Sequence, residues 1–367
     1  LSRARGLSPP CGQPERHHGT QKTGIQRPAY FFNRLHKQLK PEHSMTFDSP
    51  FSPPPGLTNP HLQTILSSVA RKALIPKPIK AFLSNTEEEI IEVADVRLVV
   101  HRNTQPNDPD GPLIMIIPGW LGNSRSSYVL SAAHQLWQQG FNLARINLRD
   151  HGDTTHLNSG LFHSALIKEV IELAQFLMAN GMAASGAQRP CGLIGYSLGG
   201  NFALRLARAI PELATLAVCP ALNPYATMRQ IESSVMYRNY FVTKWRKLFR
   251  DKQRHFPTLY DFSPAMKLSS VAALTDYFIK YHSEFDDTES YCAAYDLSGA
   301  ALAGVNAHIV AAADDPIIPA HFYEQLPKTI TVDLVDRGGH GAFLENWQLD
   351  SWIDRYSCHF FRQRLIR

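Results

Sequence analysis

Hydrophobic positions form two kinds of run that alternate along most of the chain. The run Leu113–Ile117 is five consecutive apolar residues that end at Pro118-Gly119, and it predicts a strand covered on both faces, as in a parallel sheet. Longer segments with apolar residues three or four positions apart predict amphipathic helices. The predicted strands are Leu113–Ile117, Asn142–Asn147, Cys191–Tyr196, Thr215–Cys219, Ala307–Ala312 and Ile330–Val335, and the predicted helices are Tyr128–Gln139, Ser164–Ala179 and Leu198–Ala209. This βαβ succession predicts a doubly wound α/β sheet.

Two further patterns precede the first buried strand. Asn59 before Pro60 is typical of a helix N-cap and predicts a short helix through His61–Val69. Residues Glu89–Arg102 alternate between apolar and polar, which predicts a hairpin or two antiparallel strands.

The alternation of strands and helices stops between Pro220 and Leu302, where aromatic and basic side chains are frequent. We predict a helical cap insertion over residues 223–300, with an apolar stripe on one helix face and basic residues elsewhere. The stripe comprises Met236, Tyr240, Trp245, Leu248 and Phe249, and the basic residues are Arg238, Lys244, Arg246, Lys247 and Arg250. The simplest interpretation is a helix packed on the domain with a solvated basic face. A cap that lines a substrate entrance is compatible with it, and a surface that touches anionic lipid is the alternative.

The other residues divide into an α/β core, 45–222 and 301–367, and a basic tail, 1–44. The tail holds eight Lys or Arg and two acidic residues, an excess larger than the net charge of +5 of the whole chain. It lacks apolar periodicity, and we consider an extension foreign to the natural product, a disordered basic arm or a transit peptide. The tail has no apolar region of the kind a secretory signal needs, and no later run is long enough to span a membrane, so we expect a cytoplasmic protein.

The five cysteines, Cys11, Cys191, Cys219, Cys292 and Cys358, show no CxxC spacing. We expect reduced, mostly buried thiols, as in a reducing compartment.

The strongest chemical motif is Gly195-Tyr196-Ser197-Leu198-Gly199, where a predicted buried strand meets a predicted helix. In such an elbow the glycines avoid collisions between strand and helix, and the tight turn lifts the serine hydroxyl above the sheet at the positive end of the helix. The motif predicts Ser197 as a nucleophile. A GxSxG pentapeptide arises by chance in about one chain in ten of this length, so its context matters.

An acid and a histidine follow in the order that this chemistry needs, each after a predicted strand. We predict Asp315, in the stretch Asp-Pro-Ile-Ile-Pro, as the acid and keep Asp314 as the alternate, although turn capping would explain either aspartate. His340 lies between two glycines and is the predicted general base. It would take the Ser197 proton and return it to the leaving group while Asp315 orients the imidazole.

Acyl transfer also needs amide donors for a developing oxyanion. The amide of Leu198, directly after the nucleophile, supplies one. The stretch Pro118–Gly122 at the end of a buried strand offers a second through the Trp120 amide, the alternative being a simple glycine turn with Trp120 in the core.

From about Phe51 onward, these motifs together resemble the YheT-like branch of the α/β-hydrolases. The stretch Asn59–Thr64, Asn-Pro-His-Leu-Gln-Thr, resembles the N-terminal signature of that branch, Pro118–Gly122 its oxyanion loop and Gly195–Gly199 its elbow. The resemblance implies the α/β-hydrolase fold, with a mostly parallel central sheet flanked by helices, and activity on carboxylic esters, including medium-chain acyl esters. It also implies that His61–Thr64 packs near the mouth of the site.

One stretch departs from this branch, which often has Asn-Phe-Arg-Gly-Cys-Ser-Gly where this chain has Asn147–Asp153. Asp150, His151, Asp153 and His156 suggest a metal cluster, but their spacing matches no ligand pattern of a known metal site. We predict a polar turn there, no metal and no cofactor.

The expected function is hydrolysis of a small-molecule acyl ester through a Ser197–His340–Asp315 triad and an acyl-enzyme. Acyl transfer to an alcohol shares that intermediate, and a catalytically silent binding protein could retain the fold. A nucleic-acid role has only the basic segments in its favour, without a recognised module, so we expect no nucleic-acid partner. Peripheral lipid contact through the cap is the one surface interaction considered, and no obligate protein partner is predicted.

Overall fold

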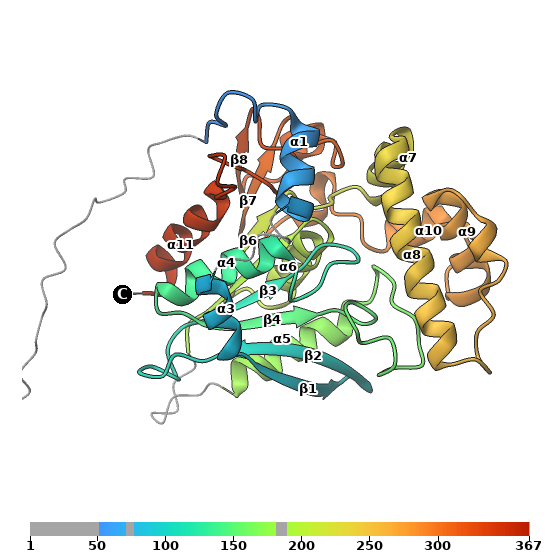
Figure 1. The fold of residues 1–367 in the computed structure, drawn as a ribbon, viewed down its shortest axis with the longest axis horizontal. Helices are drawn as coiled ribbons and strands as arrows, with labels where there is room; N and C mark the ends of the chain where they lie inside the picture. Colours follow the sequence, from blue (N-terminus) through green and yellow to red (C-terminus); the bar gives the residue numbers. More distant parts are fainter. Residues whose placement is uncertain (1–50, 71–76, 181–188, 367) are drawn as a thin grey trace, which may run out of the picture. The chain divides into compact units, whose positions relative to one another are not determined.

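A sheet of eight strands forms the centre of the part of the chain that the computed structural model describes, residues 51–70, 77–180 and 189–366 (Figure 1). The strand order is β1-β2-β4-β3-β5-β6-β7-β8. Strands β1 and β2 form an antiparallel hairpin and β2 is antiparallel to β4, whereas all neighbours from β4 to β8 are parallel. The bounds are β1 Glu87–Val93, β2 Val96–Asn103, β3 Leu113–Ile117, β4 Asn142–Asn147, β5 Cys191–Tyr196, β6 Ala214–Val218, β7 Ala307–Ala312 and β8 Ile330–Val335. The predicted mostly parallel sheet is confirmed.

Helices cover both faces of this sheet, and the side chains of one strand divide between the two faces. Ile114 and Ile116 of β3 pack with α4 Ser127–Gln138 and α11 Trp352–Leu365. Met115 and Ile117 pack with α5 Lys168–Ala179 and α6 Leu198–Ala209. All five residues of β3 are buried, and each such side chain stabilises the fold by about 1.5–3 kcal/mol. The uninterrupted apolar run therefore reflects a strand that is covered on both sides.

The remaining helices lie before the sheet or between β6 and the end of β8. Helix α1 is followed by a π-helical turn, η1, and then by α3, while η2, η3 and η4 are short 3-10 turns. Their bounds are α1 Pro60–Ile65, η1 Leu66–Ala70, α3 Lys77–Ser84, α7 Pro224–Ser233, α8 Val235–His255, η2 Ala265–Lys267, α9 Val271–His282, α10 Thr288–Ala293, η3 Gly299–Leu302 and η4 Ala320–Gln325. Figure 1 shows α7 to α10 gathered beside the sheet, which confirms the predicted helical insertion. We call these four helices the cap.

Helix α5 begins at Lys168 and not at Ser164 as predicted. The reason is a side chain from another helix. The guanidinium of Arg205 on α6 donates to the carbonyls of Ser164 and Ala165 at 2.7 and 2.8 Å. These bonds hold the segment in an irregular conformation that local periodicity does not reveal.

The predictions about the tail, the cysteines and membrane spans can be compared with the structure only where it describes the chain. The tail, residues 1–44, and Cys11 lie outside the described residues. The other four cysteines are free and buried, as predicted. Among the described residues, no helix has the combination of length and apolar character that crossing a membrane requires.

Candidate active site

The Gly195–Gly199 motif forms a sharp turn between β5 and α6. Ser197 has φ 55° and ψ −118°, backbone angles that cost a non-glycine residue of order 1–3 kcal/mol. The flanking glycines are required sterically, because a Cβ on Gly195 would lie 2.1 Å from the Gly199 oxygen and one on Gly199 would lie 2.3 Å from the Ile117 oxygen. The Ser197 amide donates to the Val218 carbonyl at 2.9 Å. Close packing therefore holds Ser197 at the first turn of α6 in one strained geometry.

Asp315 and His340 meet at the same edge of the sheet, because the parallel strands β7 and β8 both end there. Nδ1 of His340 lies 2.8 Å from Oδ2 of Asp315. The other carboxylate oxygen, Oδ1, accepts the amides of Ile317 and Ile318 at 2.8 and 3.0 Å. The Asp315 side chain is fully buried, whereas that of His340 is 15% exposed and lines the same pocket as Ser197. The Asp315 carboxylate thus holds the imidazole through Nδ1, on the side of the ring that faces away from the pocket.

The neighbouring Asp314 supports the loop and does not contact the imidazole. Its Oδ1 accepts the amides of Gly338 and Gly339, both at 2.9 Å, and burial raises the pKa of this carboxyl. The two adjacent aspartates therefore occupy different positions, one beneath the histidine loop and one against the His340 ring.

The α1 segment reaches the same loop. The amide of His340 donates to Oγ1 of Thr64 at 2.9 Å, and the side-chain amide of Gln63 bonds the backbone of Leu344 in both directions at 2.8 and 3.1 Å. Thr64 also lines the pocket. The resemblance implied that this segment lies near the mouth of the site, but no pattern in the sequence indicated that Thr64 supports the histidine backbone.

The Pro118–Gly122 turn packs against Ser197. A Cβ on Gly119 would lie 3.3 Å from Cβ of Ser197, and the Gly119 amide donates to the Tyr128 hydroxyl at 3.0 Å. Neither the Trp120 amide nor the Leu198 amide donates to another residue in the ranges that the structure describes. Both amides are therefore available to an acceptor oxygen in the pocket.

The Trp120 ring is only half-buried, and it joins the turn to the cap. It stacks on Phe241 with a centroid distance of 5.2 Å and packs edge-on to Trp245 at 5.1 Å. Both partners belong to α8. The ring also packs against two clusters of the hydrophobic core, so the role of the Trp120 amide stays a prediction.

A cavity of about 270 Å³ extends from Ser197 and His340 into the cap, close to the lower end of the size range for small-molecule sites, about 300–1,000 Å³. Helix α8 lines it with the predicted apolar stripe, extended by Tyr237 and Phe241. Residues of α7, α9 and α10 also line the cavity, namely Met228, Ile231, Val271, Thr275, Phe278, Tyr291 and Cys292. No Asp, Glu, Lys or Arg lines the cavity in the described part of the chain. The arrangement suits an uncharged, largely apolar ligand.

One group of side chains at this site has the ligand types of a metal centre. Atoms of Cys219, Asp315 and His340 lie within 4.8 Å of one another. The Cys219 thiol is buried, which raises its pKa well above the ordinary value and disfavours the thiolate that a metal would need. Both Asp315 oxygens already accept hydrogen bonds. These residues fit a hydrogen-bonded Asp–His pair better than a metal centre.

The Asn147–Asp153 stretch is a turn, but part of it lies inside the protein. Asp150 has φ 59°, and its buried carboxylate lies 2.7 Å from Nζ of Lys252 on α8. His151 is also buried, and desolvation lowers its pKa to about 4. No sequence pattern indicated this contact with the cap, because its two partners are about a hundred positions apart.

A serine at a sharp strand-to-helix turn, an Asp–His pair after β7 and β8 and a cap inserted after β6 agree with the family match, which places this chain in the alpha/beta hydrolase family. The model of that family matches residues 114–349, more than half of the chain. The confirmed fold class is therefore the α/β-hydrolase fold. The YheT-like branch is a finer assignment that this match does not reach.

Relatives and solved structures of this kind carry hydrolase names. Human Phospholipase ABHD3 is 23% identical over 264 residues, which are 68% of this chain and 63% of that protein, so the chain spans less than two thirds of its length. An esterase from Pyrococcus furiosus has a TM-score of 0.51 at 14% identity, covering 78% of this chain and 93% of that one. A serine hydrolase from Cycloclasticus zankles has a TM-score of 0.51 at 15% identity, covering 77% and 100%. At these identities the two structures show a shared fold.

Proposed function

We propose that this chain is a serine hydrolase that cleaves carboxylic acyl esters through an acyl-enzyme on Ser197. One observation carries the proposal. Ser197, the His340 imidazole held by Asp315 and the turn that bears the Trp120 amide all border the same cavity, whose remaining walls are largely apolar. The esterase and phospholipase names of similar proteins agree with it.

In the proposed reaction, His340 takes the proton of the Ser197 hydroxyl as Oγ attacks the ester carbonyl. The amides of Leu198 and Trp120 donate to the oxyanion, each worth about 3 kcal/mol in the transition state. His340 then protonates the departing alcohol, and a water molecule releases the acyl group by the same route in reverse. Asp315 keeps the proton of the neutral imidazole on Nδ1, so that Nε2 is the basic atom.

The substrate class follows from the walls of the cavity. An acyl chain without charge loses little solvation in a space lined by aromatic and aliphatic side chains, whereas a charged chain would find no counter-ion there. The Asn59–Thr64 segment, which borders the cavity through Thr64, supports an assignment to the YheT-like branch.

We further propose that the cap contacts the lipid surface from which such an ester is taken. Met236 and Tyr240 line the cavity and are 43% and 42% exposed, and Val235 beside them is 60% exposed. Residues 224–255 carry eight Lys or Arg, of which all but Lys252 lie outside the buried interior, and two acidic residues. An apolar rim within a basic segment is the composition of a surface that binds anionic lipid.

The deciding experiment is labelling with a fluorophosphonate probe, followed by hydrolysis of p-nitrophenyl esters from acetyl to dodecanoyl. We expect the wild-type chain to be labelled and active, and Ser197→Ala to be neither. Ser233→Ala, which alters an exposed serine on α7, is the matched control and should resemble wild type. An unlabelled, inactive wild type would favour a silent binding protein, and equal labelling of Ser197→Ala would exclude Ser197 as the nucleophile.

A further inference from the structure

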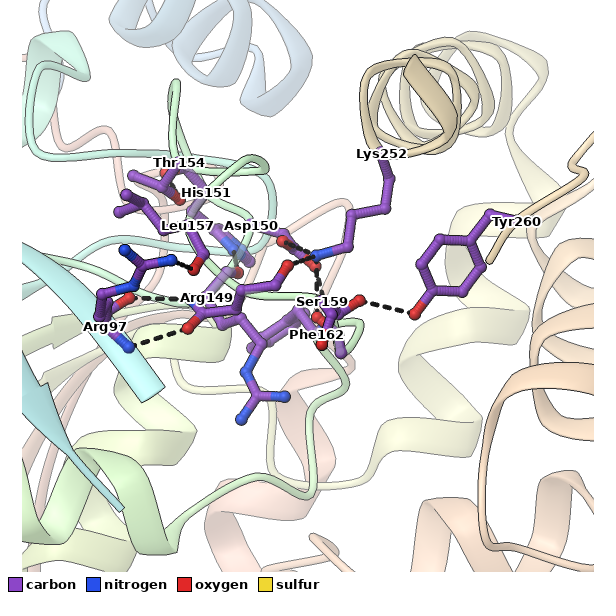
Figure 2. A network of polar contacts seen from close by, with 12 residues as sticks. Arg97, Arg149, Asp150, His151, Thr154, Leu157, Ser159, Phe162, Lys252 and Tyr260 are labelled. Carbon is purple, nitrogen blue, oxygen red and sulfur yellow. Dashed lines mark hydrogen bonds and ion pairs between the residues drawn. The ribbon is translucent and has the colours of Figure 1, made fainter. Parts of the chain in front are cut away.

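A buried ion pair joins the cap to the turn after β4 (Figure 2). Lys252 lies on the last turns of α8, and its side chain and that of Asp150 are both 0% exposed. Nζ of Lys252 donates to Oδ1 of Asp150 at 2.7 Å and to the carbonyls of Asn158 and Gly160 at 2.6 and 2.8 Å. An ammonium group has three donors, and all three are used here.

The same carboxylate also holds one wall of the cavity. Oδ2 of Asp150 accepts the amide of Phe162 at 2.9 Å, and residues 161–164 line the cavity. The segment from 148 to 167 contains no helix or strand, so such side-chain bonds determine its path. Asp150 therefore bonds to the cap through one oxygen and to the cavity wall through the other.

Lys252 extends the face of α8 that forms the roof of the cavity. Trp245, Leu248 and Phe249 precede it by seven, four and three positions, which places all four residues on one side of the helix. Trp245, Leu248 and Phe249 line the cavity, whereas the Lys252 side chain is buried against Asp150. A displacement of Lys252 would move this row of side chains with it.

We propose that the Asp150–Lys252 pair is a positioning device that sets the spacing between the α8 roof and the 161–164 wall, and so determines which acyl chains the cavity accepts. The inference rests on the proposed function, because it concerns the selectivity of the same site. Lys252 and Asp150 touch no reacting atom in this scheme. They act through Trp245, Phe249 and Phe162.

The test is the ratio of kcat/KM for p-nitrophenyl dodecanoate to that for p-nitrophenyl acetate. We expect the ratio to fall about tenfold in Lys252→Met and in Asp150→Asn, mainly through a higher KM for the long ester. In the double variant the ratio should fall no further than in either single variant, because the two side chains work as one unit. If the pair had a merely structural role, its loss would lower kcat/KM for both esters in equal proportion. An unchanged ratio would therefore overturn the proposal.

Lys247→Met is the matched control. It removes a lysine from the same helix whose partner, Asp251 at 2.5 Å, lies on α8 itself, and its side chain is 67% exposed. Its ratio should equal that of wild type. The double variant Asp150→Asn with Lys252→Met guards against misfolding, because it leaves no unpaired buried charge and Asn still offers an oxygen to the Phe162 amide. Wild type that hydrolyses neither ester would contradict both the proposed function and this inference, whereas active wild type with an unchanged ratio in the variants would contradict the inference alone.

A measurement on the wild-type chain does not depend on the folding of any variant. Hydrogen exchange should show the Phe162 amide protected to nearly the same degree as the amides of β3, because its acceptor is held by a buried pair. Exchange of Phe162 as fast as that of an exposed loop amide would mean that the pair does not hold the wall.

Discussion

The strand ends and the cap build the same cavity by different physical means. At the strand ends, short hydrogen bonds hold the polar groups, as where two backbone amides hold the Asp315 carboxylate. In the cap, most contacts are between aromatic rings, such as Trp245 with Trp120, and their geometry depends on helix placement. Under the proposed function, chemistry would reside in the first region and selectivity in the second, and the two could be altered separately.

The largest effect is expected at the strand ends. Asp315→Asn should lower kcat for a short ester about 10⁴-fold, because an amide cannot hold the imidazole in the required tautomer. Asp314→Asn should lower it less than tenfold, because the amide oxygen of Asn can still accept from Gly338 and Gly339. Steady-state kinetics of both purified variants measure these two losses. Equal losses of kcat would remove the distinction between the two aspartates.

A smaller effect is expected where the two regions meet, at buried His151, whose ring packs edge-on to Phe162 at 4.5 Å. Its pKa is about 4 in the folded chain against an ordinary value of 6.5, so the unfolded chain binds more protons between these values. The part of the free energy of unfolding that depends on His151 is therefore at its highest above pH 6.5. It falls by about 3 kcal/mol in total as the pH falls towards 4.

Urea unfolding of wild type and His151→Gln between pH 4 and pH 7 measures this effect. The variant should show a shallower decline towards acid, because glutamine does not titrate. Identical slopes for the two chains would show that His151 is not the group responsible.

In the cap, Trp245→Ala should act on selectivity. Loss of its apolar surface removes about 1.5–3 kcal/mol of binding, which corresponds to a loss of about 10- to 100-fold in kcat/KM for the dodecanoyl ester. The acetyl ester should be affected much less, because it occupies only the end of the cavity near Ser197. Trp347→Ala, at a tryptophan that is 59% exposed and absent from the cavity lining, is the control. Equal losses of kcat/KM for the two esters would mean that Trp245 affects the chemical step and not the selectivity.

The smallest effect is expected at the outer rim of the cap. In a Ser197→Ala background, which prevents hydrolysis, Val235→Ser should weaken binding to vesicles containing phosphatidylserine by about fivefold, the equivalent of about 1 kcal/mol of lost apolar contact. Ile90→Ser, at a residue of β1 that is 52% exposed, should bind like the background chain. Sedimentation with vesicles measures both, and equal binding of the two variants would argue against this rim as the contact surface.

Much of the site was accessible from the sequence because it depends on local rules. Gly195 and Gly199 flank Ser197 for steric reasons that operate within five residues. Asp315 follows the mostly buried strand β7, and His340 follows the edge strand β8, whose residues are mostly half-buried or exposed. The apolar runs predicted the order of strands and helices. The start of α5 was wrong by four residues, because the Arg205 guanidinium competes for the carbonyls of Ser164 and Ala165.

The sequence by itself determined the sheet, the elbow and the order of the candidate catalytic residues, since each is encoded by neighbouring side chains and by strand periodicity. Only the tertiary structure distinguished the positions of Asp314 and Asp315, placed Thr64 under the His340 backbone and joined Asp150 to Lys252. These contacts link segments tens to hundreds of residues apart. Their energies depend on burial and on distances that arise only when the strand ends and the cap have packed together.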